Sequence, residues 1–127
     1  MGYQILLSLA VFVFFSMPKA QINAQPLKKV EPEFIGGKAK FGSFIMKNYS
    51  YPSQALKANV TGQIVVRFRV TQNGGIDSVQ ATKHYGFGTG EEIVRVIKLT
   101  SGQWKPGRIN GKRAAMFVTM PMYLEPD

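Results

Sequence analysis

The chain has 127 residues, enough for one domain, and 45% of them are hydrophobic, as in an ordinary globular protein. It contains no cysteine, which excludes a disulfide framework and a thiolate metal site. The formal net charge of +9 suggests an anionic partner or surface, but the basic residues are scattered singly or in pairs, which favours an ordinary solvated surface.

An almost unbroken apolar run extends from Ile5 to Phe15. It is too short to span a bilayer, which takes about 20 apolar residues in a helix. The run predicts the core of a secretory signal that is cleaved after Ala20 or, better, after Ala24. We therefore assign residues 1–24 to a signal peptide and expect export. No Lys or Arg precedes the run, so an uncleaved membrane anchor is the alternative.

Residues 25–40 are expected to form an extended linker, because they mix proline with charged residues. The domain itself is predicted over residues 41–127. It starts with a weak helix, in which Phe41, Phe44 and Ile45 have the spacing of one apolar face. Pro52 suits the first position of a second, short helix that runs to Asn59. The residues expected to be buried on this second helix are Ala55, Leu56 and Val60.

A strict alternation of apolar and polar residues follows, which predicts a half-buried antiparallel strand. Its inward residues are Ile64, Val66, Phe68 and Val70. Asn73-Gly74 should supply the left-handed conformations of a tight hairpin. The returning strand is expected from Ile76 to His84, with Val79 and Ala81 inward.

A helix from Glu91 to Leu99 and a last strand from Arg113 to Leu124 complete the predicted domain. The helix carries an apolar stripe made of Ile93, Val96, Ile97 and Leu99. Asn110-Gly111 turns the chain into the last strand. On that strand one face holds Ala114, Met116, Val118, Met120, Met122 and Leu124. The predicted fold class is α+β, a three-stranded antiparallel sheet with helices packed on one face.

Several separated motifs in this order resemble the C-terminal domain of TonB, the energy transducer of the bacterial envelope. They are Phe34-x-Gly-Gly, Tyr51-Pro52, Gly62-Gln63 before the alternating strand, Trp104-x-Pro before the last strand, and Met120-Pro121-Met122 within it. The resemblance implies a periplasmic module that works in energy-coupled transport. It also implies that the last strand binds a short N-terminal segment of an outer-membrane TonB-dependent receptor by strand addition. A second copy of the chain, paired through the same edge, is another partner to consider.

The residues implied in protein binding fall on the last strand and just before the short helix. They are Arg113, Ala115, Phe117, Thr119 and Tyr123, and Asn48, Tyr49, Ser50, Tyr51 and Pro52. The chain departs from the best-known members in two respects. It has no long proline-rich spacer, since 16 residues from Gln25 to Lys40 reach at most about 55 Å. It also has Asn48-Tyr49-Ser50 where those members have Gln-Pro-Gln.

No constellation of residues predicts an enzyme, a cofactor or a metal. The glycines at 86, 88 and 90 do not have the spacing of a dinucleotide loop, and His84 is the only histidine. The six methionines indicate core filling in preference to a binding groove. The alternative function is a structural envelope protein whose basic surface, with Arg67 and Arg69, binds anionic wall polymer or lipid. The export signal argues against nucleic acid as the partner of that surface.

Overall fold

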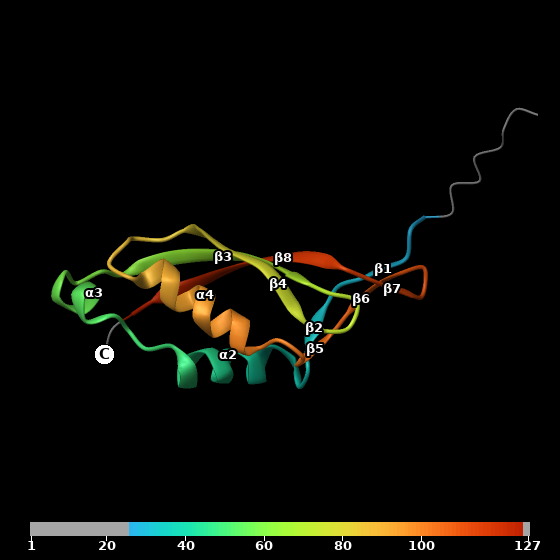
Figure 1. The fold of residues 1–127 in the computed structure, drawn as a ribbon, viewed down its shortest axis with the longest axis horizontal. Coiled ribbons are helices and arrows are strands. Elements are labelled where there is room, and N and C mark those ends of the chain that lie inside the picture. The colour runs from blue at the N-terminus through green and yellow to red at the C-terminus, as the bar shows by residue number, and fades with distance from the viewer. Residues whose placement is uncertain (1–25, 126–127) are drawn as a thin grey trace, which may run out of the picture.

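The computed structural model describes residues 26–125, so the expected signal peptide lies outside the described residues. Three strands form the main antiparallel sheet in the order β4-β3-β8 (Figure 1). Their bounds are β4 (Ile76–Lys83), β3 (Gly62–Val70) and β8 (Met116–Leu124). The helices are α2 (Gly37–Asn48), α3 (Ser53–Lys57) and α4 (Thr89–Leu99), and α2 and α4 lie on the same side of the sheet (Figure 1). The predicted α+β fold is confirmed.

The core lies between β3 and α4. Ile64, Val66, Phe68 and Val70 of β3 are completely buried, which confirms the predicted face of this strand. On α4 the stripe of Ile93, Val96 and Ile97 is buried as predicted, but Leu99 is exposed. Because successive residues of a helix are rotated by about 100°, Thr100 falls in line with Ile93 and Ile97 and takes the inward position, whereas Leu99 points aside.

The expected linker of residues 25–40 is wrong, because most of it is part of the fold. β1 (Lys29–Val30) pairs with β6 (Gly107–Ile109), and β2 (Glu33–Phe34) pairs with β5 (Trp104–Lys105). Phe34 is buried, with its ring centroid 5.5 Å from that of Trp104. Trp104 also contacts the rings of Phe41 and Phe68, each at 5.3 Å. This aromatic cluster ties the start of the described chain to the sheet, which shortens the free reach of residues 25–40.

The predicted last strand is divided into two. β7 (Lys112–Ala114) pairs with β6 in a hairpin, and β8 begins only at Met116. The turn between β6 and β7 uses Asn110 and Gly111, both with positive φ, as predicted. Arg113 and Ala115 are therefore not on the edge strand, and their assignment to it is wrong. The chain leaves one small sheet and joins another at this point, which a single period-two pattern does not reveal.

Two smaller expectations also fail. Leu56 is 45% exposed, because α3 ends at Lys57 and is too short to turn both Ala55 and Leu56 inward. In the β3–β4 hairpin only Gly74 has a positive φ, of 81°, and Asn73 does not. The hairpin is closed by the Gly74 N–H, which donates to the Thr71 carbonyl oxygen at 3.0 Å, and by the Thr71 N–H, which donates to the Gly75 carbonyl oxygen at 2.8 Å.

Candidate protein-binding edge and groove

The two edges of the main sheet differ. Edge strand β4 contains a register shift where Ser78 has a φ of 52°, and α4 packs against it. Edge strand β8 pairs with β3 from Met116 to Leu124 without any shift. A bulge interrupts the row of backbone groups that an added strand would need, whereas a straight edge presents them in register. The edge suited to accept a further strand is therefore that of β8.

Pro121 indicates which backbone groups of β8 point outward. Proline has no N–H and within sheets stands where its nitrogen faces away from the neighbouring strand. Along a strand, alternate residues turn their backbone groups to the same side. The N–H groups of Phe117, Thr119 and Tyr123 then face outward from β8. The Phe117, Thr119 and Tyr123 predicted from the sequence lie on this strand, with side chains on the open face of the sheet.

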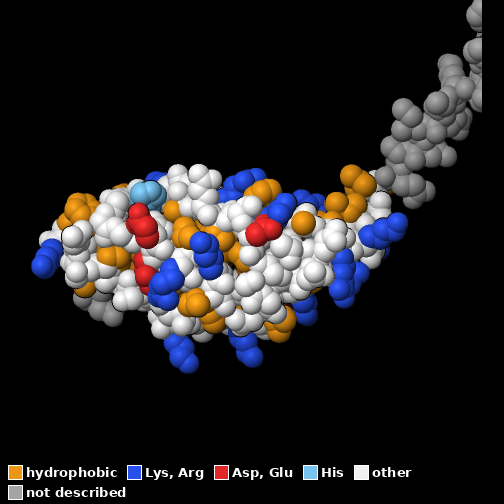
Figure 2. All heavy atoms as spheres, in the orientation of Figure 1, with side chains coloured by type: hydrophobic (Ala, Val, Ile, Leu, Met, Phe, Trp, Pro, Cys, Tyr) orange, Lys and Arg blue, Asp and Glu red, His pale blue; other side chains and the backbone are white. Residues whose placement is uncertain are grey.

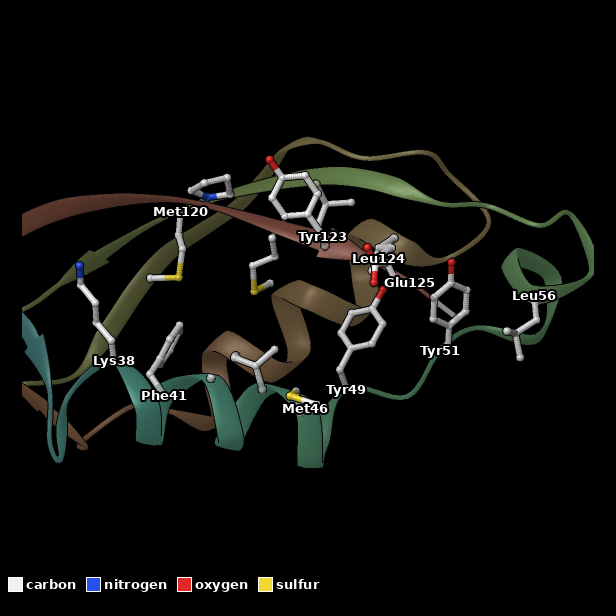
Figure 3. Close-up of a pocket in the computed structure, with 15 residues that line it drawn as sticks. Lys38, Phe41, Met46, Tyr49, Tyr51, Leu56, Met120, Tyr123, Leu124 and Glu125 are labelled. Atoms are coloured by element: carbon white, nitrogen blue, oxygen red, sulfur yellow. The ribbon is translucent and has the colours of Figure 1, made fainter. Parts of the chain in front are cut away.

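A groove of about 1040 Å³ runs beside this edge, between α2 and β8 (Figure 3). Side chains from the helix point across it toward side chains from the strand (Figure 3). The apolar residues that line its central part are Phe41, Ile45 and Met46 from α2, and Met120, Met122 and Leu124 from β8. Lys38 lies at one end of the groove and Leu56 at the other, with Glu125 between Tyr49 and Tyr51 (Figure 3). An open backbone edge and an apolar groove thus stand next to each other.

Methionine supplies three of these lining residues. Met46 is 84% exposed, while Met120 and Met122 are half-buried. Among residues 26–125, Met116 is buried, and Met120 and Met122 pack against the core as well as lining the groove, so the expected core filling holds for these three. An unbranched thioether side chain adapts its shape to different partners at little cost. Met46, Met120 and Met122 therefore line a candidate binding groove, which is the role that the sequence alone did not favour.

The segment 48–52 is divided by the structure. Tyr49 and Tyr51 line the groove, whereas Asn48, Ser50 and Pro52 do not. The Ser50 N–H donates to the Glu92 carboxylate on α4 at 2.8 Å. The Asn48 carbonyl oxygen accepts from Arg95, which also pairs with Glu92. Pro52 lies next to Gly88, and the contacts of these three residues within the domain fix the path of the chain.

Tyr49 and Tyr51 both use their hydroxyls within the domain, and the Tyr49 hydroxyl is held protonated. Burial, with a further contribution from Glu92 and then Tyr51, raises the pKa of Tyr49 to about 12. The Tyr49 hydroxyl lies 3.4 Å from the Thr89 carbonyl oxygen, and that of Tyr51 donates to the Val60 carbonyl oxygen. The groove therefore has an aromatic wall where these two tyrosines lie. Glu92 accepts a hydrogen bond from the Ser50 N–H, between the two tyrosines in the chain. The pKa of Glu92 is lowered by its hydrogen bond with Arg95.

The open face of the sheet carries the arginines that the sequence singled out. Arg67 lies over the ring of Phe117, with its guanidinium carbon 3.5 Å from the ring centroid. Arg69 forms two hydrogen bonds with Asp77, at 2.7 and 2.6 Å. Both guanidinium groups thus already have partners within the domain. This face is a weak candidate for the expected basic surface.

The sequence did not single out the helical wall of the groove. One signal in the sequence points to this wall. Met46 directly follows Ile45 and makes the apolar stripe of α2 wider than the buried pair Phe41 and Ile45 alone.

Among residues 26–125 no cluster of three or more metal-ligating side chains occurs, and His84 is exposed at the end of β4. Within that same part of the chain, no helix has the length and apolar character needed to cross a membrane.

A sheet with one straight open edge, flanked by an apolar groove, is an arrangement suited to binding another protein. The sequence matches the family described as Gram-negative bacterial TonB protein C-terminal over residues 47–123. The chain belongs to this family, whose members act in the cell envelope as interaction domains in transport. A comparison with curated protein sequences gives no significant match.

Proposed function

We propose that the domain binds an extended segment of an outer-membrane TonB-dependent receptor by adding it as a strand to β8. The observation that carries this proposal is the straight free edge of β8 beside the groove. The receptor as partner comes from membership of the family. The domain would act in the periplasm as a binding module of energy-coupled transport, with no catalytic role.

The groove indicates what kind of peptide fits. Side chains of a strand alternate between its two faces. In a peptide added beside β8, every second side chain would enter the groove between Met46 and Met122, and the others would lie on the open face near Phe117 and Tyr123. We therefore expect the bound segment to place large apolar residues at every second position.

The binding strength can be estimated from the backbone. An added strand would form about four to six hydrogen bonds with β8, each with a net value of about 0.5–1.5 kcal/mol. Ordering of the peptide and loss of its free motion offset part of this. The result is moderate, reversible binding, which suits a module that must hold and release its partner.

The test is the substitution Thr119→Pro. It removes an outward N–H from the middle of the edge and should leave the pairing with β3 intact, as Pro121 already does. Binding is measured by titration calorimetry with synthetic peptides that cover the N-terminal segments of the host's TonB-dependent receptors. We expect Thr119→Pro to keep the circular dichroism spectrum of the fold and to lose peptide binding. Thr119→Ala keeps the N–H and is the matched control, which should bind.

A second variant tests the groove. Met46→Gln places a polar amide at the groove wall, on a side chain that is 84% exposed and so adds little to stability. It should weaken peptide binding, while Lys47→Gln, on the neighbouring exposed residue outside the groove lining, should not. Normal binding by Thr119→Pro would refute strand addition. If sedimentation shows instead that β8 is occupied by a second copy of the chain at the working concentration, the edge serves self-association and not the receptor.

A further inference from the structure

Positive charge gathers at the end of the molecule formed by the small sheet of β1, β6 and β7. We call this the basic end. Its six cationic residues are Lys28, Lys29, Lys105, Arg108, Lys112 and Arg113, and all six are exposed. In Figure 2, Lys and Arg side chains appear at the end of the molecule where the described chain begins. The sequence does not reveal this group of cations, because β1 lies far from β6 and β7 along the chain.

Lys105 stands opposite Glu33 in the β2–β5 pairing, but the charges of the β6–β7 hairpin are arranged unfavourably for the domain by itself. Arg108 stands directly opposite Arg113 in the β6–β7 pairing, and like charges in that position destabilise a strand pair. Lys29 pairs with Glu31, but among the described residues no carboxylate lies within salt-bridge distance of Arg108, Arg113 or Lys112. An anionic ligand would relieve this repulsion, because it would place negative charge between the two guanidinium groups.

Apolar side chains stand among the cations. Leu27, Val30 and Ile109 are 72%, 52% and 38% exposed. Val30 shares one face of the small sheet with Arg108 and Arg113, and Ile109 shares the other face with Lys29 and Lys112. Cations beside exposed apolar groups match a membrane surface, which offers phosphate groups to the first and the edge of the acyl region to the second. A dissolved polyanion would leave the apolar side chains in water.

We propose that the basic end docks the domain on a membrane surface rich in anionic phospholipid. This site is separate from the groove, whose lining includes none of the six cationic residues. β1, β6 and β7 lie at one end of the elongated molecule, and the last residues of β8 lie toward the other (Figure 1). A domain held on a membrane by its basic end would therefore keep the β8 edge available.

The test compares vesicles of phosphatidylcholine alone with vesicles that also contain phosphatidylglycerol, using the full chain at low salt. The quantity measured is the ratio of the two partition coefficients. A contribution from the apolar run of residues 5–15 is present with both vesicles and cancels in this ratio. Each cation near an anionic membrane contributes roughly fivefold, so Arg108→Gln with Arg113→Gln should lower the ratio roughly 25-fold. Lys57→Gln with Lys83→Gln makes the same charge change away from the basic end and should lower it little.

A third variant distinguishes lipid from a soluble polyanion. Val30→Ser should weaken binding to the anionic vesicles but leave the binding of soluble polyphosphate unchanged. An equal loss in the two double variants would overturn the proposal, because it would show a general charge effect. So would a Val30→Ser protein that binds the anionic vesicles as the unaltered chain does, since the end would then be a polyanion site. Circular dichroism confirms the fold of each variant, and Lys28→Gln with Lys112→Gln provides a second test if the arginine variant does not fold.

Discussion

Replacement of Gly74 by alanine should destabilise the domain far more than the same change at Gly102. Both glycines have a positive φ, of 81° and 88°. They differ in what a Cβ atom would meet. At Gly74 it would lie 2.3 Å from the backbone carbonyl oxygen of Trp104, whereas at Gly102 nothing lies within 4 Å. The pair of substitutions therefore separates the cost of the backbone conformation from the cost of the contact.

The conformational cost is common to both. A left-handed conformation costs a residue with a Cβ about 1–2 kcal/mol, offset by about 0.4–1 kcal/mol because alanine restricts the unfolded chain. Gly102→Ala should therefore lose about 1 kcal/mol. At Gly74 the methyl group would also push against a backbone atom that is held by the packed ring of Trp104, and overpacking of this kind costs about 1–3 kcal/mol. Gly74→Ala should lose about 3 kcal/mol in total.

Tryptophan fluorescence is the assay, because Trp104 is the only tryptophan of the chain. Its side chain is 6% exposed, so its fluorescence reports both unfolding in urea and any local movement. We expect Gly74→Ala to show a lower midpoint in urea and a red-shifted emission in the folded state. Gly102→Ala should show the unaltered spectrum. Equal losses of stability in the two variants would mean that the hairpin does not approach Trp104 as closely as described.

Two further predictions concern the core and the segment before α3. Phe68→Ala should lose about 3–5 kcal/mol in urea unfolding because Phe68 is completely buried, while Arg69→Ala, next to it on the open face, should lose far less because its ion pair with Asp77 is exposed to solvent; comparable losses would mean that the predicted face of β3 does not point inward. Glu92→Gln should lose about 1–2 kcal/mol at neutral pH, because the charged carboxylate accepts from Ser50 and Arg95. The pKa of Glu92 is lowered in the folded protein, so this contribution is present above the ordinary glutamate pKa of about 4.3 and disappears as the pH falls through the lower folded value. Thermal unfolding from pH 7 to 2 checks this, with the exposed Glu91→Gln as the control; a loss that persists at pH 2 would contradict it.

The sequence predicted β3 and α4 well, because the spacing of their apolar residues matches the side of each element that is buried. β3 alternates strictly because one face is the core and the other is open, so its four inward residues could be identified. α4 has a clear stripe for the same reason, and only its last member was misplaced. In both cases the local pattern and the tertiary contacts agree.

The elements that the sequence missed depend on distant partners. β1 and β2 have two residues each, too few to show any period, and they exist because residues 104–109 lie beside them. Prolines and charges at residues 26–33 are typical of a linker, and only the burial of Phe34 in the cluster around Trp104 changes that interpretation.

The same limit applies to the candidate binding site. Phe117, Thr119 and Tyr123 could be placed on the edge strand, because one strand with a proline carries that information. The groove could not be predicted, because its lining comes from both α2 and β8. No pattern in either segment indicates that the two elements face each other. The basic end was hidden for the same reason.

The direction of β8 has a mechanical consequence. β3 and β8 run along the long axis of the molecule, and the described chain begins near one end of that axis (Figure 1). A peptide paired with β8 would lie along the same axis. A pull applied to the domain from that end and resisted by the peptide would act in shear, so that every hydrogen bond between the two strands bears the load together. A pull across the strands would open those bonds one after another, at a much smaller force. A connection of moderate affinity at equilibrium can therefore be strong under tension in one direction and easy to peel apart in another.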